Sequence, residues 1–141
     1  MTERELMLAG RLYNLYKVGD NTWETIRATC KKFNESEFWH DTRAFEELKN
    51  NFGRAGNPMV LTPPFYCDYG DRIHFGDHFY ANTGLTILDE NEVVFGDYVF
   101  LGPNVNIYTA SHPICAEVRN LELETAETVR IGNSVWIGAM L

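Results

Sequence analysis

The sequence feature that most constrains the fold is a six-residue register in the second half of the chain. Its hexads open on an apolar residue, usually followed by glycine, at Phe75, Ala81, Phe95, Leu101, Ile131 and Ile137. Two extra residues near 89–94 and a longer interruption after Ile107 break the count, which then returns. A six-residue period is typical of a three-sided solenoid, in which each hexad supplies one flat face and one corner and stacked coils share a core. An antiparallel sheet with Gly-Asp and Gly-Asn turns explains any one segment but not the returning register, so we predict a left-handed parallel β-helix.

The residue types within each hexad agree with this prediction. The opening apolar residue is expected to point into the prism, and the glycine after it allows backbone conformations closed to most side chains. The fifth residue is again apolar and often β-branched, which favours a buried strand position. It is found at Phe79, Leu85, Val99, Val105 and Val135.

The first part of the chain, residues 1–53, has helical spacing instead. An apolar stripe from Leu6 to Tyr16 predicts a first helix that ends at Val18-Gly19. Thr22 is expected to cap a second helix, with Trp23, Ile26, Cys30 and Phe33 on one side. Asp41 or Thr42 is expected to start a third, which stops at Gly53.

The expected fold class is therefore mainly β, with an N-terminal α-helical segment. Residues 54–72 contain Gly56, Pro58, Pro63 and Pro64 near their start and predict a non-helical connector. Residues 73–141 are the expected β-helix, with an inserted loop at 108–130.

Composition and charge exclude several classes of function. A net charge of −8 with a single adjacent basic pair, Lys31-Lys32, argues against a nucleic-acid partner. No apolar run approaches the roughly 20 residues that would span a membrane, and the charged start of the chain is unlike a signal peptide. Three widely spaced cysteines predict free thiols in the cytoplasm. His74 and His78 flank an inward Phe75 without a third ligand, so we predict no metal.

Several motifs resemble the sugar O-acetyltransferases of the maltose and galactoside acetyltransferase group, within the hexapeptide-repeat superfamily. The segments that carry the resemblance are 2–5, 9–13, 64–70, 79–82, 102–105, 108–113 and 131–138. They extend over essentially the whole chain, and the most specific is Tyr-Thr-Ala-Ser-His-Pro at 108–113, just before the inserted loop. The resemblance implies a homotrimer with active sites between neighbouring prisms. It also implies transfer of an acetyl group from acetyl-coenzyme A to a sugar hydroxyl.

His112 is the candidate general base for this reaction. An alcohol is a poor nucleophile until a base removes its proton, and histidine has an ordinary pKa near neutrality. His112 stands where the hexad register breaks, so its side chain is able to leave the prism; the alternative is a loop histidine in a His-Pro turn. Glu124 matches a glutamate of the family and is the preferred partner of the base over Glu122, although an acidic, solvated loop explains both residues as well.

The resemblance also implies binding residues. Asp68, Tyr80, Asn82 and Glu90 correspond to acceptor or substrate contacts, and Trp136 and Ala139 to contacts with coenzyme A. Asn82 is also typical of a β-helix corner, Asp68 and Glu90 of turns, and Trp136 of core or trimer packing.

Two departures from the family pattern stand out. Asn14 and Leu15 occupy the place where many relatives carry an aspartate that contacts the acceptor. The sequence ends at Leu141, whereas relatives continue for several hexads that hold much of the coenzyme A site. We therefore expect a shortened β-helix, and the alternative function is an inactive or weakly active binding or assembly module.

Overall fold

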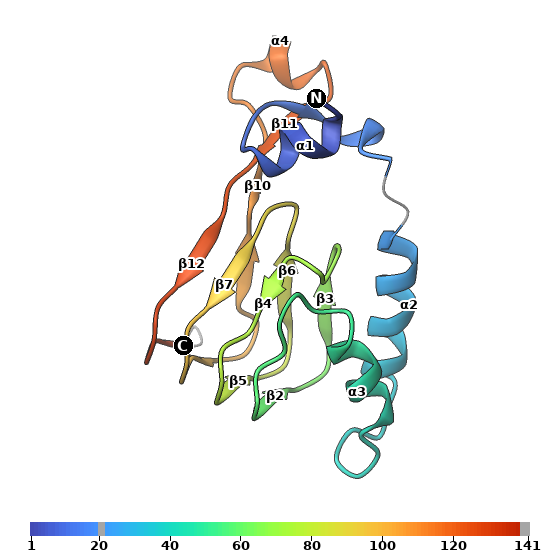
Figure 1. Cartoon of the computed structure of the whole chain (residues 1–141), viewed down its shortest axis with the longest axis vertical. Helices are drawn as coiled ribbons and strands as arrows, with labels where there is room; N and C mark the ends of the chain where they lie inside the picture. The colour runs from blue at the N-terminus through green and yellow to red at the C-terminus, as the bar shows by residue number, and fades with distance from the viewer. Residues whose placement is uncertain (20–21, 139–141) are drawn as a thin grey trace.

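Three sheets of parallel strands form a three-sided coil in the computed structural model, which describes residues 1–19 and 22–138 (Figure 1). The first sheet contains β2 (Met59–Leu61), β5 (Phe79–Ala81), β8 (Phe100–Leu101) and β13 (Trp136–Ile137). The second contains β3 (Phe65–Cys67), β6 (Leu85–Leu88) and β9 (Asn106–Tyr108). The third contains β4 (Ile73–His74), β7 (Val93–Phe95) and β12 (Val129–Ile131). Consecutive strands visit the three sheets in turn, so the chain winds around one axis.

The register of the sheets explains the irregularity of the hexads. Tyr80 pairs with Phe100, and Thr86 with Asn106, each across a separation of twenty residues. A coil is therefore two residues longer than three hexads, and the extra residues lie at the corner before β7. Val93 pairs with Val129, because the inserted segment separates β9 from β12.

The glycine and acidic residues of the hexads have a shared structural role at one corner. A Cβ atom added at Gly76 would lie 2.0 Å from the carbonyl oxygen of Gly96 in the next coil, so only glycine fits. The next residue, Asp77, donates its backbone N–H to the carboxylate of Asp97, and Asp97 donates likewise to the side chain of Asn133. This ladder satisfies backbone donors that the corner removes from the sheets.

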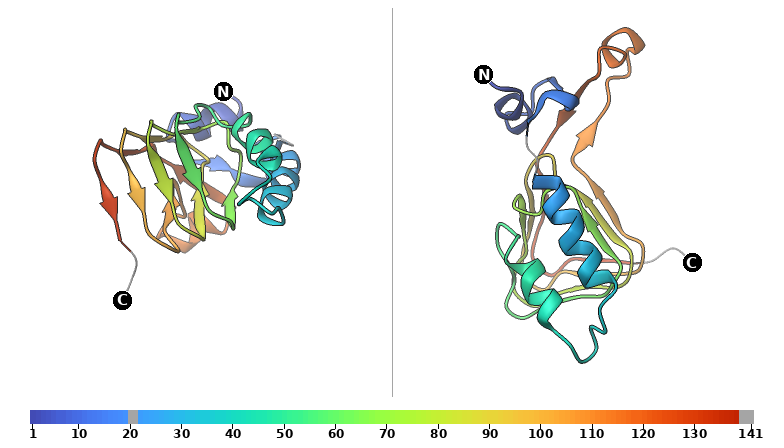
Figure 2. Two further views of the ribbon diagram at one scale, coloured as in Figure 1. Left: turned by 90° about the horizontal axis from the view of Figure 1, so that it is seen from below. Right: turned by 90° about the vertical axis from the view of Figure 1, so that its right-hand side faces the viewer.

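Two helices close the first end of the coil. These are α2 (Thr22–Asn34) and α3 (Arg43–Lys49), and Figure 2 shows both lying across that end. Phe33, Leu48 and Phe52 join the core of the coil, where the ring of Phe52 packs against Phe75 at 4.8 Å between centroids. The helices thus bury apolar side chains that the first coil would otherwise expose. Trp23 is not part of this buried face, contrary to prediction, and is 45% exposed.

The structure corrects two boundaries. The first helix, α1 (Glu3–Leu8), stops early because Gly10 has a φ of 71° in the left-handed region. Tyr13 and Asn14 then form strand β1, followed by a 3₁₀ turn at Leu15–Lys17. The expected connector contains β2 and β3, which pair in parallel with β5 and β6, so the coil begins before residue 73.

Candidate active site beside the inserted segment

The inserted segment forms a small sheet with the N-terminus of the chain. Strands β10 (Ala110–Ser111) and β11 (Leu123–Ala126) pair antiparallel, with helix α4 (Ala116–Arg119) between them. Strand β1 (Tyr13–Asn14) pairs with the other edge of β11, with Tyr13 opposite Glu124. Figure 1 shows α1 and this sheet together beyond one end of the strands of the coil. Segments more than 100 residues apart in sequence therefore meet at one place.

The N-terminal segment and the inserted segment together form a lobe, and a buried asparagine connects this lobe to the coil. The side-chain amide of Asn91 donates to the carbonyl oxygens of Met7, Leu8 and Ala126. Asn91 belongs to the corner before β7, and the three carbonyls belong to the N-terminal segment and to β11. One side chain therefore connects the coil to both the N-terminal segment and β11.

His112 and Glu124 face each other at this lobe, as the sequence predicts. His112 directly follows β10 and its side chain is 60% exposed, whereas the side chain of Glu124 is 11% exposed. The distance between His112 Nε2 and Glu124 Oε2 is 3.7 Å. This separation is suited to an ion pair when the imidazole is protonated.

Tyr13 is a third member of this group. Its hydroxyl donates a hydrogen bond to Glu124 Oε1, the carboxylate oxygen that does not face His112. Burial, and then the hydrogen bond to Glu124, raise the pKa of Tyr13, so the phenol stays protonated and keeps donating. Tyr13 thus orients the carboxylate, and the carboxylate is positioned to orient the imidazole.

A hollow of about 440 Å³ lies next to this group; we call it the Glu90 hollow. Its polar lining includes Tyr13, Tyr16, Arg27, Asp68, Tyr69, Glu90 and Glu124. Asp68 follows β3 and Glu90 follows β6, so the same corner of two successive coils supplies both carboxyl groups. The guanidinium of Arg27, on α2, lies 3.6 Å from Asp68. The volume falls in the range of small-molecule sites, roughly 300–1,000 Å³.

Three carboxyl groups line the hollow, and one of them, Glu90, is held in its neutral form. Burial, and then a hydrogen bond to Asp68, raise the pKa of Glu90 to about 9. At neutral pH Glu90 is therefore a neutral acid that donates to the Asp68 carboxylate. Its Oε2 atom is buried without a protein hydrogen-bond partner. The hollow thus presents the carboxyl groups of Asp68 and Glu124, a neutral acid and a guanidinium, which together suit a ligand rich in hydroxyl groups.

The remaining predicted residues lie elsewhere in the chain. Tyr80 lies on the outer face of the first sheet, in one row with Phe100 and the exposed Trp136. Asn82 is at the corner between β5 and β6, where its side chain accepts from the backbone N–H of Thr83. That corner is a different edge of the prism from the one that holds Glu90. Ala139 lies outside the described residues.

Two residues of the site were missed from the sequence. Tyr13 falls in the apolar stripe of the expected first helix, and only its pairing with β11 brings its hydroxyl to Glu124. Arg27 has no neighbouring motif, and α2 places it against Asp68 through tertiary packing. Tyr13 does lie in segment 9–13, which carries part of the family resemblance, but nothing in the sequence assigns it or Arg27 to the site.

Metal sites, disulfides and membrane-spanning helices are the other features to consider. Among residues 1–19 and 22–138, no three His, Cys, Asp or Glu side chains gather closely enough to hold a metal ion. Cys30, Cys67 and Cys115 are free thiols. No helix in the described part of the chain is long and apolar enough to cross a bilayer.

Comparison with known proteins identifies relatives over nearly the whole chain, although no family model matches. Nodulation protein L of Rhizobium meliloti is 40% identical over 146 residues, which cover 97% of this chain and 75% of that protein. A maltose O-acetyltransferase from Clostridium difficile has a TM-score of 0.90 at 37% identity, covering 99% of this chain and 75% of the other. A galactoside acetyltransferase in complex with coenzyme A also has a TM-score of 0.90, at 32% identity, covering 99% of this chain and 70% of the other.

The extent of these matches differs between relatives. The chain spans from 44% to 75% of the length of the curated relatives that it matches. The sequence identity and the shared architecture nevertheless extend through the coil, the capping helices and the inserted segment. The chain belongs to the hexapeptide-repeat acetyltransferase family, together with the galactoside and maltose O-acetyltransferases.

Proposed function

We propose that this chain carries the acceptor side of an acetyl-coenzyme A-dependent sugar O-acetyltransferase, with His112 as general base. The observation that carries the proposal is the series Tyr13–Glu124–His112 beside the Glu90 hollow. Two solved relatives support the donor, since one contains coenzyme A and another acetyl-coenzyme A. Galactoside and maltose O-acetyltransferases among the relatives support a sugar acceptor.

The proposed chemistry follows from the arrangement of these side chains. A sugar in the Glu90 hollow places one hydroxyl at His112, and the imidazole accepts its proton as the oxygen attacks the thioester carbonyl of acetyl-coenzyme A. Glu124 stabilises the resulting imidazolium at 3.7 Å, and Tyr13 holds that carboxylate in place. Collapse of the tetrahedral intermediate forms the acetyl ester and expels the coenzyme A thiolate, which takes the proton from His112.

The Glu90 hollow is proposed to hold the rest of the sugar. Asp68 accepts hydrogen bonds from sugar hydroxyls, and Arg27 donates to them. Glu90, as a neutral acid, adds a polar group without a second negative charge beside Asp68. This arrangement favours a neutral polyol over an anion.

Homotrimer assembly would complete the site. Asn82 and Tyr80 lie on a different edge and face of the prism from His112, so in one chain they are apart from the Glu90 hollow. The exposed row Tyr80, Phe100 and Trp136 suits burial against a neighbouring subunit. We propose that Asn82 of one subunit approaches His112 of the next, where its amide stabilises the oxyanion, and that Trp136 and Ala139 contact coenzyme A. In this proposal the coil is the left-handed β-helix of the family, and the enzyme works in the cytoplasm.

The test of the proposed base is acetyl transfer to a sugar panel by wild type and His112→Ala. Loss of thioester absorbance is the suitable readout, because the exposed Cys115 would react with thiol reagents. Removal of the base is expected to lower kcat by about 10²- to 10⁴-fold. His40→Ala is the matched control, since His40 also pairs with a glutamate, Glu37 at 2.9 Å, on an exposed surface. Equal rates for wild type and His112→Ala would contradict the assignment.

The shared site has its own test. His112→Ala and Asn82→Ala are each expected to be inactive, and trimers assembled from a mixture of the two contain some sites with both native residues. Random assembly of equal amounts restores about a quarter of the wild-type activity, because each site takes one residue from each of two neighbours. If mixed assembly restores no activity, both residues act within one subunit or Asn82 has no role.

A further inference from the structure

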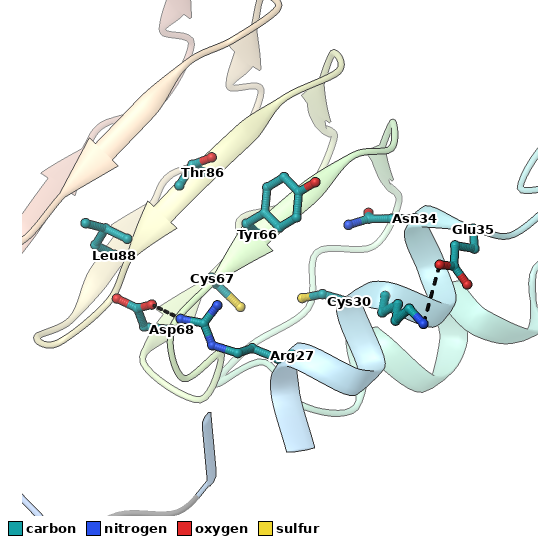
Figure 3. Close-up of a pocket in the computed structure, with 10 residues that line it drawn as sticks. Arg27, Cys30, Asn34, Glu35, Tyr66, Cys67, Asp68, Thr86 and Leu88 are labelled. Atoms are coloured by element: carbon teal, nitrogen blue, oxygen red, sulfur yellow. Dashed lines mark ion pairs between the residues drawn. The ribbon is translucent and has the colours of Figure 1, made fainter. Parts of the chain in front are cut away.

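A second hollow, of about 490 Å³, adjoins the Glu90 hollow and has no role in the proposed acetyl transfer; we call it the α2 hollow. It lies between helix α2 and the outer side of strands β3 and β6 (Figure 3). The lining side chains that matter here are Arg27, Tyr66, Asp68, Thr86 and Leu88. Its volume is again that of a small-molecule site, roughly 300–1,000 Å³.

The two hollows share a wall. Arg27 and Asp68 line both, and their ion pair at 3.6 Å stands between them. Glu124, the partner of His112, lines only the Glu90 hollow. The order in space is therefore the base, the Glu90 hollow, the Arg27–Asp68 pair and then the α2 hollow. A ligand that begins at the base and extends past this pair enters the α2 hollow.

The lining of the α2 hollow suits a sugar ring. Tyr66 is 52% exposed on the outer face of β3, and Thr86 stands opposite it in register on β6. An aromatic face packs against the apolar C–H face of a pyranose, while a hydroxyl and a guanidinium bond to its edge. Leu88 adds a further apolar contact at the wall.

The walls are also held in place without a ligand. The side chain of Asn34, near the end of α2, accepts from the backbone N–H of Phe65 at 2.8 Å and donates to its carbonyl at 3.0 Å. This pair of bonds fixes α2 against β3 beside Tyr66. A preformed hollow costs less conformational entropy on binding.

The charges at the hollow disfavour an anionic ligand such as the phosphates of coenzyme A. Arg27 is paired with Asp68, and Lys31 is paired with Glu35 at 3.7 Å. Both cations of the lining are thus balanced by carboxylates, and the whole chain carries a net charge of −8. A neutral ligand is the better match.

We propose that the α2 hollow binds the second unit of a disaccharide or oligosaccharide acceptor whose first unit occupies the Glu90 hollow. This inference rests on the proposed function, since that function places a sugar in the Glu90 hollow. It makes the preferred substrate class a glycoside of two or more units. Tyr66 is then a specificity-determining residue that contacts the substrate away from the reacting hydroxyl.

The test is calorimetric binding of two matched sugar pairs, glucose with maltose and galactose with lactose, to wild type and Tyr66→Ala. We expect the disaccharide of at least one pair to bind about tenfold more tightly than its monosaccharide, the size of one additional ring contact. Tyr66→Ala should remove most of this ratio. Tyr98→Ala is the matched control, because Tyr98 is 50% exposed but lies at a different corner, stacked on His78; it should keep the ratio. Thermal unfolding of each variant checks that it is folded.

Several outcomes would overturn the inference. Equal affinity for both members of each pair refutes a second sugar subsite, whether or not acetyl transfer is detected. Equal weakening of monosaccharide and disaccharide by Tyr66→Ala refutes the separation of the two hollows. Weakening of coenzyme A binding by Tyr66→Ala, with the disaccharide unaffected, assigns the hollow to the donor instead. Conversely, a disaccharide preference in a protein that transfers no acetyl group refutes the proposed function and leaves the subsite.

Discussion

The raised pKa of Glu90 makes the stability of the protein depend on pH in a direction opposite to that of most carboxyl groups. The ordinary pKa of 4.5 applies in the unfolded chain, and the value in the folded protein is about 9. Between these values the folded protein keeps a proton that the unfolded chain has released. The free energy of unfolding is therefore highest, for this group, below the unfolded pKa, and it falls as pH rises towards the folded pKa.

The size of the effect follows from the same linkage. One proton of difference lowers the free energy of unfolding by up to about 1.4 kcal/mol per pH unit. Glu90 is only partly buried, so solvent screening reduces its effect on the free energy of unfolding, and we take about half of that value. Between about pH 5.5 and about pH 7.5 the wild type should lose about 1–1.5 kcal/mol through Glu90. Glu90→Gln keeps a neutral polar side chain of similar shape that cannot ionise. The difference in free energy of unfolding between Glu90→Gln and wild type should therefore shift in favour of the variant by that amount over the same pH range.

Urea denaturation followed by tryptophan fluorescence, at fixed protein concentration, measures this difference. All other ionisable groups are present in both proteins, so their contributions cancel in the comparison. Glu46→Gln is the control, because Glu46 is an exposed partner of Lys49 and should retain the wild-type pH dependence. The reasoning is refuted if Glu90→Gln and wild type change in parallel across the range.

Three further perturbations test other contacts. Tyr13→Phe removes the donor to the nearly buried Glu124 carboxylate, so it should lower kcat about tenfold and lower the free energy of unfolding by about 1–3 kcal/mol, as steady-state kinetics and chemical denaturation would show; an unchanged kcat argues against the orienting role. Asn91→Ala removes the amide that bonds to Met7, Leu8 and Ala126 and should cost about 1–3 kcal/mol in chemical denaturation, and a cost near zero would show that water replaces it. Gly76→Ala should lower the free energy of unfolding by about 2–4 kcal/mol, because its Cβ would meet the Gly96 carbonyl. Gly132→Ala, which has nothing within 4 Å of its Cβ, should change this free energy by under about 0.5 kcal/mol. Equal effects of the two substitutions would contradict the close stacking of the coils.

The architecture of the coil was predictable because its cause is local and repeats. Most hexads carry an inward apolar residue followed by glycine, and those of one corner add Asp or Asn, so one pattern is repeated several times in the sequence. The corner bonds of Asp77 and Asp97 show why an acidic or amide residue follows the glycine. The start of the coil was not predictable, since β2 and β3 lack the glycine-marked hexad register and form through pairing with β5 and β6.

The candidate site likewise has some features that the sequence predicts and others that only the tertiary structure determines. The break in the register and the Tyr-Thr-Ala-Ser-His-Pro segment marked His112 as the candidate base, and the resemblance to the sugar acetyltransferases marked Glu124 as its candidate partner. Only tertiary structure decided that Tyr13 leaves its expected helix to bond with Glu124. It also decided that burial keeps Glu90 neutral and that Arg27 separates two hollows. These features depend on segments distant in sequence and on exclusion of water, and neither leaves a periodic signal in the chain.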